Sequence, residues 1–139
     1  MDKNKLENFV SFVKNLKGDE KGEAQTFCDR FFRAFGHDGL IEAKGILEAR
    51  IKFRENNKTK FADCLWCPKN GDGVLIEMKN ISIKNLESHF NQARDYWIEM
   101  NPEKEFGQGA QKPKYIILCN FERFFLQSCV IGHFFGQQL

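Results

Sequence analysis

The sequence of 139 residues lacks several features that would assign a protein to a class at once. It contains no apolar run long enough to span a membrane, no internal repeat and no low-complexity segment. Its formal net charge is only +2, so charge balance neither requires nor excludes a nucleic-acid partner. The length is that of one domain, in which about two-thirds of the chain surface can be buried on folding.

The sequence also lacks a convincing zinc site and a signal peptide. It has five cysteines, an odd number, which together with the missing signal peptide favours a reducing cytoplasm as the location. Cys64 and Cys67 have the spacing of a zinc knuckle, but no second close pair of Cys or His accompanies them. We therefore expect buried thiols and no zinc.

The main indication of chemistry is an acid on one expected strand, followed by an acid and a lysine on the next. Residues 60–66 and 74–79 each have the composition of a strand, and the turn-rich residues between them favour a hairpin. Such a hairpin can place Asp63 beside Glu77, and the two-residue period of a strand puts Glu77 and Lys79 on one face. Adjacent carboxylates repel each other unless a cation lies between them, and Mg²⁺ prefers one or two carboxylates together with water and phosphate oxygens.

An ordinary surface hairpin with a Glu/Lys pair is the alternative interpretation. An acid and a lysine two residues apart on a strand are common, so the triplet Glu77-Met78-Lys79 alone is a weak signal. The triplet ends an apolar run, however, where an unpaired charge is costly to bury. The pattern is therefore what a metal-assisted site for phosphodiester cleavage requires.

Residues 83–100 are expected to form a helix with two separate stripes. The apolar stripe comprises Leu86, Phe90, Ala93 and Trp97, and the polar stripe comprises Asn85, His89, Gln92 and Tyr96. If the apolar stripe packs on the sheet, the polar stripe borders the acids, and Gln92 is the best candidate to meet a DNA phosphate or the attacking water. A solvated helix edge is the alternative, which periodicity alone favours.

The other expected elements are helices at residues 3–17 and from about 19 or 22 to 35, and strands at residues 46–54, 115–119 and 124–129. The strand, helix and strand over residues 74–119 should form a right-handed parallel crossover. Glu23 lies in the first turns of the second helix, off its apolar stripe. Its charge either interacts favourably with the helix dipole, or it is a third carboxylate at the cleft.

Two surface features allow more than one interpretation. Basic residues cluster at Arg50, Lys52, Arg54, Lys58 and Lys60. They either follow phosphates or form a solvated sheet edge, and the second interpretation is the default. Residues 124–139 end without a polar tail, which suggests a fragment of a longer chain or an edge that packs on another domain. The alternative is a final strand that completes the core.

The order of elements, with the acids where they are, resembles the PD-(D/E)XK nuclease fold, an α/β fold of three layers in which helices flank a central mixed sheet. The resemblance is closest to the N-terminal nuclease domain of MmeI-type enzymes, which are single-chain restriction-modification proteins of types IIG and IIL. It spans about residues 23–128. Four ordered blocks carry it: Phe61-Ala62-Asp63, Leu75-Ile76-Glu77-Met78-Lys79, Gln92-Ala93-Arg94-Asp95-Tyr96-Trp97, and the run from Tyr115 to Phe124.

The resemblance implies a metal-dependent deoxyribonuclease that hydrolyses phosphodiester bonds in double-stranded DNA with Mg²⁺, or with Mn²⁺ as a substitute. The residues that it implies are Asp63 and Glu77 as metal ligands, the Met78 carbonyl as a further ligand, Lys79 as the catalytic lysine, and Gln92 and Glu23 as additional site residues. One departure is the loop of residues 68–73, which is longer than expected between these strands.

The resemblance also implies what surrounds the domain. Residues 1–139 are expected to be a single nuclease domain, the N-terminal fragment of a longer protein with methyltransferase and target-recognition domains. The chain contains no Gly-rich cofactor loop and no Asn/Asp-Pro-Pro-aromatic motif of a methyltransferase, so it is expected to cut or nick DNA without choosing the sequence. Two alternatives stay open: a catalytically silent DNA-binding or docking module, and a stand-alone junction resolvase.

Overall fold

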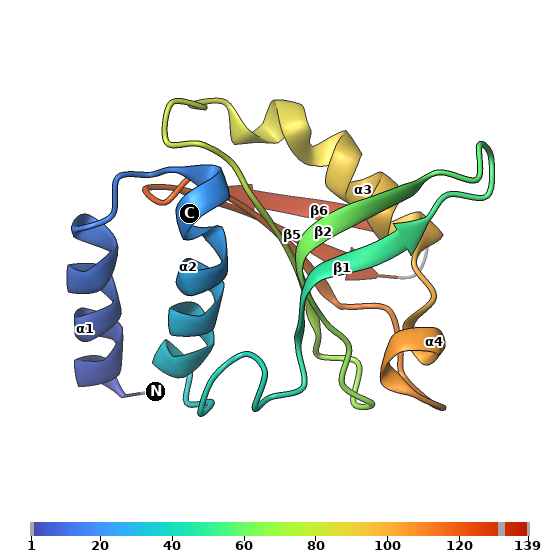
Figure 1. Cartoon of the computed structure of the whole chain (residues 1–139), viewed down its shortest axis with the longest axis horizontal. Helices are drawn as coiled ribbons and strands as arrows, with labels where there is room; N and C mark the ends of the chain where they lie inside the picture. Colours follow the sequence, from blue (N-terminus) through green and yellow to red (C-terminus); the bar gives the residue numbers. More distant parts are fainter. Residues whose placement is uncertain (1, 131–132, 139) are drawn as a thin grey trace.

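A mixed sheet of six strands lies at the centre of the computed structural model, which describes residues 2–130 and 133–138, and side chains up to residue 129 (Figure 1). The elements are α1 (Lys3–Lys14), α2 (Glu20–Ala34), β1 (Ile46–Lys52), β2 (Thr59–Trp66), β3 (Val74–Met78), the 3-10 helix η1 (Leu86–His89), α3 (Phe90–Glu99), α4 (Pro102–Phe106), β4 (Tyr115–Cys119), β5 (Phe124–Val130) and β6 (His133–Gln138). Helices α1 and α2 lie side by side on one face of the sheet, and α3 lies on the other. The expected α/β class, with helices flanking a mixed sheet, is therefore confirmed.

The strands follow one another across the sheet in chain order. Strands β1, β2 and β3 pair antiparallel, as do β4, β5 and β6. Among the described strands, β3 and β4 form the one parallel pair, and the segment that contains η1 and α3 connects them. The expected parallel crossover is present. Strand β6 extends the sheet beyond β5, so the C-terminal stretch includes a final strand. Whether that strand completes the core, as one of the expectations had it, depends on side chains that lie outside the described residues.

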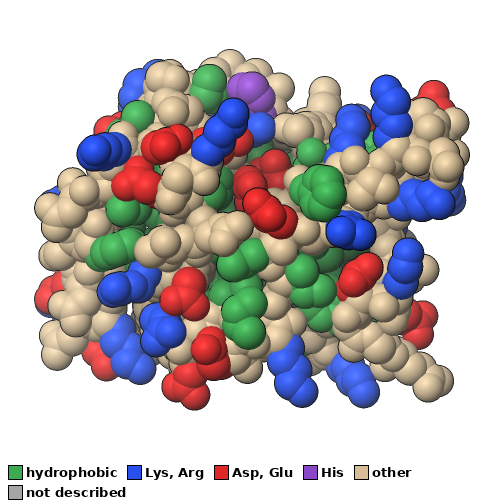
Figure 2. Space-filling model, viewed as in Figure 1, with side chains coloured by type: hydrophobic (Ala, Val, Ile, Leu, Met, Phe, Trp, Pro, Cys, Tyr) green, Lys and Arg blue, Asp and Glu red, His purple; other side chains and the backbone are tan. Residues whose placement is uncertain are grey.

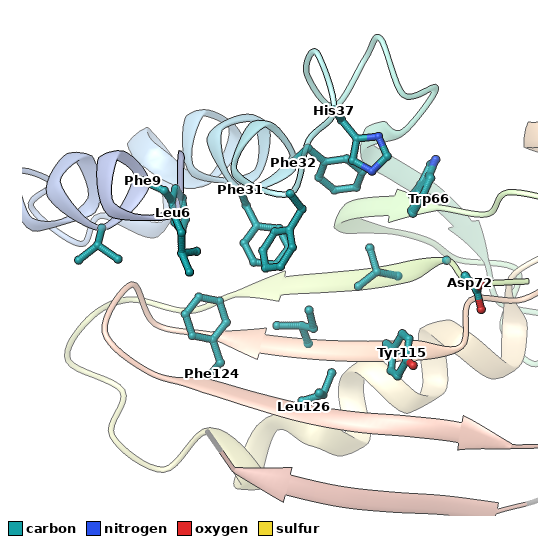
Figure 3. A pocket seen from close by; sticks show the side chains of 15 residues that line it. Leu6, Phe9, Phe31, Phe32, His37, Trp66, Asp72, Tyr115, Phe124 and Leu126 are labelled. Carbon is teal, nitrogen blue, oxygen red and sulfur yellow. The ribbon is translucent and has the colours of Figure 1, made fainter. Parts of the chain in front are cut away.

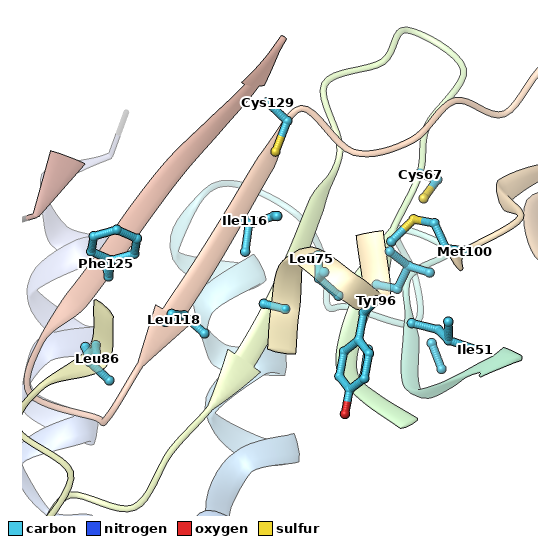
Figure 4. Close-up of a cluster of buried hydrophobic side chains, with 14 residues drawn as sticks. Ile51, Cys67, Leu75, Leu86, Tyr96, Met100, Ile116, Leu118, Phe125 and Cys129 are labelled. Atoms are coloured by element: carbon cyan, nitrogen blue, oxygen red, sulfur yellow. The ribbon is translucent and has the colours of Figure 1, made fainter. Parts of the chain in front are cut away.

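Two apolar cores form on opposite faces of the sheet, because side chains of a strand alternate between faces. Leu75 of β3 belongs to the α3-side core, which also contains Leu86, Ala93 and Tyr96 (Figure 4). Ile76 and Met78 belong to the α2-side core. That core is rich in aromatic contacts, among them the ring pairs Phe9–Phe27 and Phe27–Phe121, whose centroids lie 5.3 and 5.4 Å apart. Both cores hold β3 between them, and all five of its residues are buried.

The cysteines contribute to these cores as expected. All five are free and buried. Cys28, Cys64 and Cys119 are part of the α2-side core, and Cys67 and Cys129 are part of the α3-side core. In the part of the chain that the structure describes, no helix is long and apolar enough to cross a membrane.

The helix over residues 83–100 was predicted as one piece and is corrected by the structure. Its first turn is the 3-10 helix η1, and the α-helix begins only at Phe90. Asn85 explains the late start, because its side-chain oxygen accepts a hydrogen bond from the Ser88 N–H and its carbonyl accepts one from the Ser88 hydroxyl. The first helix likewise ends at Lys14 rather than at residue 17. The short helix α4 was not predicted.

The β2–β3 turn closes regularly in spite of its length. Trp66 lies opposite Val74, and Gly71 donates a backbone hydrogen bond to the Pro68 carbonyl. Gly73 is required at the end of this turn, because a Cβ atom there would collide with the Trp66 carbonyl oxygen. The longer loop therefore leaves the register of the hairpin intact.

One distortion of the sheet bears directly on function. Residues two apart on a regular strand share a face, yet Ala62 of β2 packs in the α3-side core and Cys64 packs in the α2-side core. Strand β2 therefore changes faces at Asp63. The β1–β2 pairing is interrupted at the same place, between the pairs Leu47–Cys64 and Ala49–Ala62, where Glu48 has a φ of 50° in the left-handed region. The outer half of the hairpin begins at this point.

Candidate active site

Asp63 and Glu77 meet where β2 and β3 separate. The last backbone pair of the two strands is Cys64 with Ile76. One position further, the Asp63 N–H donates to Oε1 of Glu77 at 2.9 Å, and the Met78 N–H donates to Oδ2 of Asp63 at 2.7 Å. Each carboxylate thus accepts a hydrogen bond from a backbone N–H of the other strand. In a regular ladder, a backbone carbonyl would accept that bond. The juxtaposition predicted from the hairpin is present.

Both acids hold their protons more tightly than ordinary carboxyl groups do. Burial, with a smaller contribution from the charge of Asp63, raises the pKa of Glu77 to about 8, and only 4% of the residue surface is exposed. Burial also raises the pKa of Asp63, although the hydrogen bond from the Met78 N–H opposes this. The charge of Lys79 lowers the pKa of both acids, but it does not outweigh burial. When both acids are ionised, the site carries an excess of negative charge. Binding of either a proton or a cation offsets this charge.

Lys79 follows β3 directly, and α3 holds its side chain. Its backbone N–H donates to the Cys119 carbonyl at 2.7 Å, which fixes the chain at the end of the strand. Its Nζ atom donates to Oε1 of Gln92 at 2.8 Å, and Nε2 of Gln92 donates to the Tyr96 hydroxyl at 3.0 Å. Two members of the predicted polar stripe, Gln92 and Tyr96, therefore border the acids. Asn85 of the same stripe instead caps η1.

Glu23 lies at the start of α2 and binds backbone groups. Its carboxylate accepts hydrogen bonds from the N–H groups of Lys17, at 3.0 Å, and Asp19, at 2.9 Å. These bonds, that of Asp19 first, lower the pKa of Glu23. Both oxygens of the Glu23 carboxylate therefore bind backbone amides at the start of the helix.

Two acids that the sequence did not single out lie closer to the site. The charge of Glu20, the first residue of α2, raises the pKa of both Asp63 and Glu77, and the charge of Glu48 raises that of Asp63. Figure 2 shows acidic side chains gathered near the middle of the face of the molecule that it presents. Glu20 had the same sequence signal as Glu23, an acid in a first helical turn. Glu48 had none, because its position depends on the distortion of β1.

The donor set is suitable for a hard divalent cation. Within the described residues, Oδ1 of Asp63 and Oε2 of Glu77 make no hydrogen bond, so each acid retains a free oxygen. Carboxylate oxygens suit Mg²⁺, which keeps several waters and needs few protein ligands. The described residues contain no group of three or more His, Cys, Asp or Glu side chains arranged to hold a metal. The side chains that could hold such a cation are therefore the carboxylates of Asp63 and Glu77, to which the resemblance adds the Met78 carbonyl as an expected ligand.

A pocket on the α2 side is separate from these acids. Its volume is about 610 Å³, and its walls come from α1, α2 and strands β2 to β5 (Figure 3). Apolar and aromatic side chains dominate the lining, among them Phe31, Phe124 and Leu126. None of Asp63, Glu77 and Lys79 is part of it. The pocket therefore does not contribute to the chemistry of the acids.

The chain is similar to a known protein family. The family model described as "MmeI, N-terminal domain" matches residues 1–135, nearly the whole chain. No match was found among curated proteins or among solved structures.

Proposed function

Since the chain belongs to the family of MmeI N-terminal domains, and is thereby a component of a restriction-modification enzyme, we propose that it is a Mg²⁺-dependent endonuclease domain that hydrolyses phosphodiester bonds in double-stranded DNA. One observation carries the proposal. Asp63 and Glu77 lie together at the separated ends of two strands, each with a free oxygen, and Lys79 follows on the same face. We further propose that the α/β fold is of the PD-(D/E)XK type.

Each residue of the site has a distinct part in the proposed reaction. Asp63 and Glu77 hold the metal, together with the Met78 carbonyl. When bound, Mg²⁺ supplies a Lewis acid that activates water and offsets the charge that develops on the phosphate. The Lys79 ammonium donates to the attacking water or to a phosphate oxygen, which positions the water in line with the bond to be broken. Gln92 keeps the ammonium in place through the bond at 2.8 Å.

The surroundings of the domain follow from the same family. We propose that the domain acts within a larger multidomain protein, in which methyltransferase and target-recognition domains choose the DNA sequence. The domain itself supplies the cut, in the cytoplasm, where DNA and a reducing environment for the five free thiols coexist.

Cleavage of supercoiled plasmid tests the proposal. In Mg²⁺, the wild type is expected to nick or linearise the plasmid, and Asp63→Asn is expected to be at least about a hundredfold slower because one metal ligand loses its charge. Asparagine retains the oxygen that accepts from the Met78 N–H, so the fold should persist. Asp72→Asn, at an exposed acid in the β2–β3 turn, is the matched control and should cut normally. Equal cutting by wild type and Asp63→Asn would contradict the proposal.

A catalytically silent docking module is the second candidate, and the apolar pocket of about 610 Å³ is the observation that favours it. Titration calorimetry with Mn²⁺ separates the two functions. The nuclease requires metal binding that Asp63→Asn and Glu77→Gln each weaken. If the wild type binds no divalent metal, the docking function is favoured instead.

The two acids of α2 are expected to behave differently when replaced. Glu23→Ala should lower the Tm, because the N–H groups of Lys17 and Asp19 lose their acceptor, and metal binding by the folded protein should not change. Glu20→Gln should leave the Tm near that of the wild type and weaken Mn²⁺ binding, because it removes a negative charge near the site. Thermal unfolding and calorimetry provide both readouts. A catalytic role for Glu23 requires the reverse pattern.

A further inference from the structure

The five basic residues of the β1–β2 hairpin differ in what they contact. Nε of Arg54 donates to Oε2 of Glu99 at 3.0 Å, and Nζ of Lys60 lies 4.8 Å above the centroid of the Phe53 ring. By contrast, Arg50, Lys52 and Lys58 are exposed and have no ion pair or side-chain hydrogen bond within the described residues. These cations are therefore available to an outside partner, and Arg50 and Lys52 are the two that belong to β1.

Phe61 is the exposed aromatic residue of the same hairpin. It lies directly opposite Arg50 in the β1–β2 register, and 51% of its surface is exposed. Its ring makes no contact with another aromatic ring or with a cation among the described residues. An exposed phenylalanine alone has no particular meaning, but this one has a free arginine as its cross-strand neighbour.

These three side chains share one face of the hairpin. Ala49, Ile51 and Ala62 all pack in the α3-side core. Since neighbouring residues on a strand point to opposite faces, Arg50, Lys52 and Phe61 point away from that core, toward the side of the sheet on which α2 lies. Figure 2 shows Lys and Arg side chains along the hairpin, next to the acids at the middle of the same view.

The face is close to the candidate active site. Phe61 precedes Asp63 by two residues on β2, which is a separation of roughly 7 Å along a strand. This is about two nucleotide steps along a DNA strand. A strand whose phosphate lies at the Asp63/Glu77 pair would therefore pass the ring of Phe61 with a neighbouring nucleotide.

We propose that Arg50, Lys52 and Phe61 form a DNA-binding face, in which the two cations hold backbone phosphates and the Phe61 ring stacks on an unstacked base beside the cut. Aromatic rings stack on any base, and exposed cations bind phosphate without reading sequence. Such a face fits a domain that cuts without choosing its target. The identity of the ligand as DNA rests on the proposed function, but binding through this face requires no metal and no cleavage.

A groove of about 770 Å³ borders β1 and shares the two cations of this face. Arg50 and Lys52 contribute to its lining, together with Arg54, Lys104, Glu99 and Glu105. Arg54 is already paired with Glu99. The two acids offset only part of the attraction of the four cations for a polyanion.

Fluorescence anisotropy in EDTA tests the proposal on the 139-residue chain. The probes are a labelled blunt duplex and the same duplex with a single-stranded overhang. The wild type should bind the overhang more tightly, because its bases are already unstacked. Phe61→Ala and Phe61→Leu should each weaken binding to the overhang by about tenfold or more, and Phe61→Trp should restore it. Phe35→Ala, at a phenylalanine that is 46% exposed on the end of α2, should change nothing.

The two cations have a separate readout. Arg50→Ala and Lys52→Ala should each reduce the slope of log affinity against log salt by about one, whereas Lys14→Ala on α1 should leave it unchanged. Circular dichroism confirms the fold of each variant. Wild-type affinity in Phe61→Ala, restoration by leucine, or unchanged salt slopes would overturn the proposal. Binding is measured without metal, so a chain that binds through this face but never cuts would refute the proposed nuclease and leave this face intact.

Discussion

A Glu77→Gln variant is expected to unfold at a higher temperature than the wild type in EDTA at pH 8, and to cut DNA at least about a hundredfold more slowly in Mg²⁺. Both effects come from the same negative charge. Burial raises the pKa of Glu77 to about 8, so ionised Glu77 destabilises the folded protein when no cation is present. Glutamine removes the charge, and its oxygen can still accept the hydrogen bond from the Asp63 N–H.

The pH dependence of stability follows from the same shift. Unfolded, Glu77 loses its proton near its ordinary pKa of 4.5, whereas in the folded protein it keeps the proton until about pH 8. Between these values the folded state binds more protons than the unfolded state, so the free energy of unfolding falls as pH rises from about 4.5 to about 8. Denaturant titrations in EDTA should show this fall for the wild type and a much smaller one for Glu77→Gln. The smaller fall that remains in Glu77→Gln is expected from Asp63, whose pKa is also raised.

Mg²⁺ should reverse the order of stability at pH 8. The metal binds the ionised acids, so it should raise the Tm of the wild type and have little effect on Glu77→Gln. Glu122→Gln, at an exposed acid that contacts Lys84 at 3.5 Å, is the control and should respond to metal as the wild type does. A Glu77→Gln protein that is no more stable than the wild type in EDTA would contradict the effect of burial, and one that still cuts would contradict the role of Glu77.

Replacing Lys79 by methionine is expected to slow cleavage by about a hundredfold or more without weakening Mn²⁺ binding. Methionine retains most of the side-chain length, but it has no charge and no hydrogen to donate. Gln92 holds the ammonium of Lys79 at 2.8 Å, and the charge of Lys79 lowers the pKa of both Asp63 and Glu77. Its removal therefore deprives the water or the phosphate of a donor, while it relieves repulsion between the ammonium and the metal.

Single-turnover cleavage and calorimetry measure the two quantities separately. Lys84→Met is the matched control, because Lys84 is an exposed lysine five residues further along whose contacts are the Ile81 carbonyl and Glu122. It should cut as the wild type does. If Lys79→Met keeps the wild-type rate, Lys79 has no catalytic part. If it loses metal binding together with cleavage, Lys79 serves the fold of the site and not the chemical step.

The sequence predicted those parts of the site that depend on local periodicity. The two-residue period of β3 placed Glu77 and Lys79 on one face, and the helical period placed Gln92 on the edge of α3 that borders them. Turn residues predicted the hairpin that joins Asp63 to Glu77. These patterns are set by the backbone of a single element, and so they can be seen without the rest of the structure.

Features that depend on competition between groups could not be predicted in the same way. Glu20 and Glu23 both occur in the first turn of α2, and only the position of the Lys17 and Asp19 amides shows that Glu23 binds the backbone. The reversal of faces at Asp63 combines a left-handed residue on one strand with a twist of its neighbour, which no periodicity records. Ser88 and Asn85 delayed α3 by local hydrogen bonds that compete with the helix.

The reciprocal hydrogen bonds of Asp63 and Glu77 have an evolutionary consequence. Each acid accepts from a backbone amide of the other strand, so selection acts on it twice, once for cutting and once for folding. A descendant that no longer needs to cut would be released from the first constraint but not from the second. Asn at position 63 and Gln at position 77 retain the acceptor oxygens, whereas aliphatic residues would leave two amides without a partner. Lys79 contacts Gln92 only through its side chain, so it is free to drift, and its loss would be the earlier sign that such a lineage has stopped cutting.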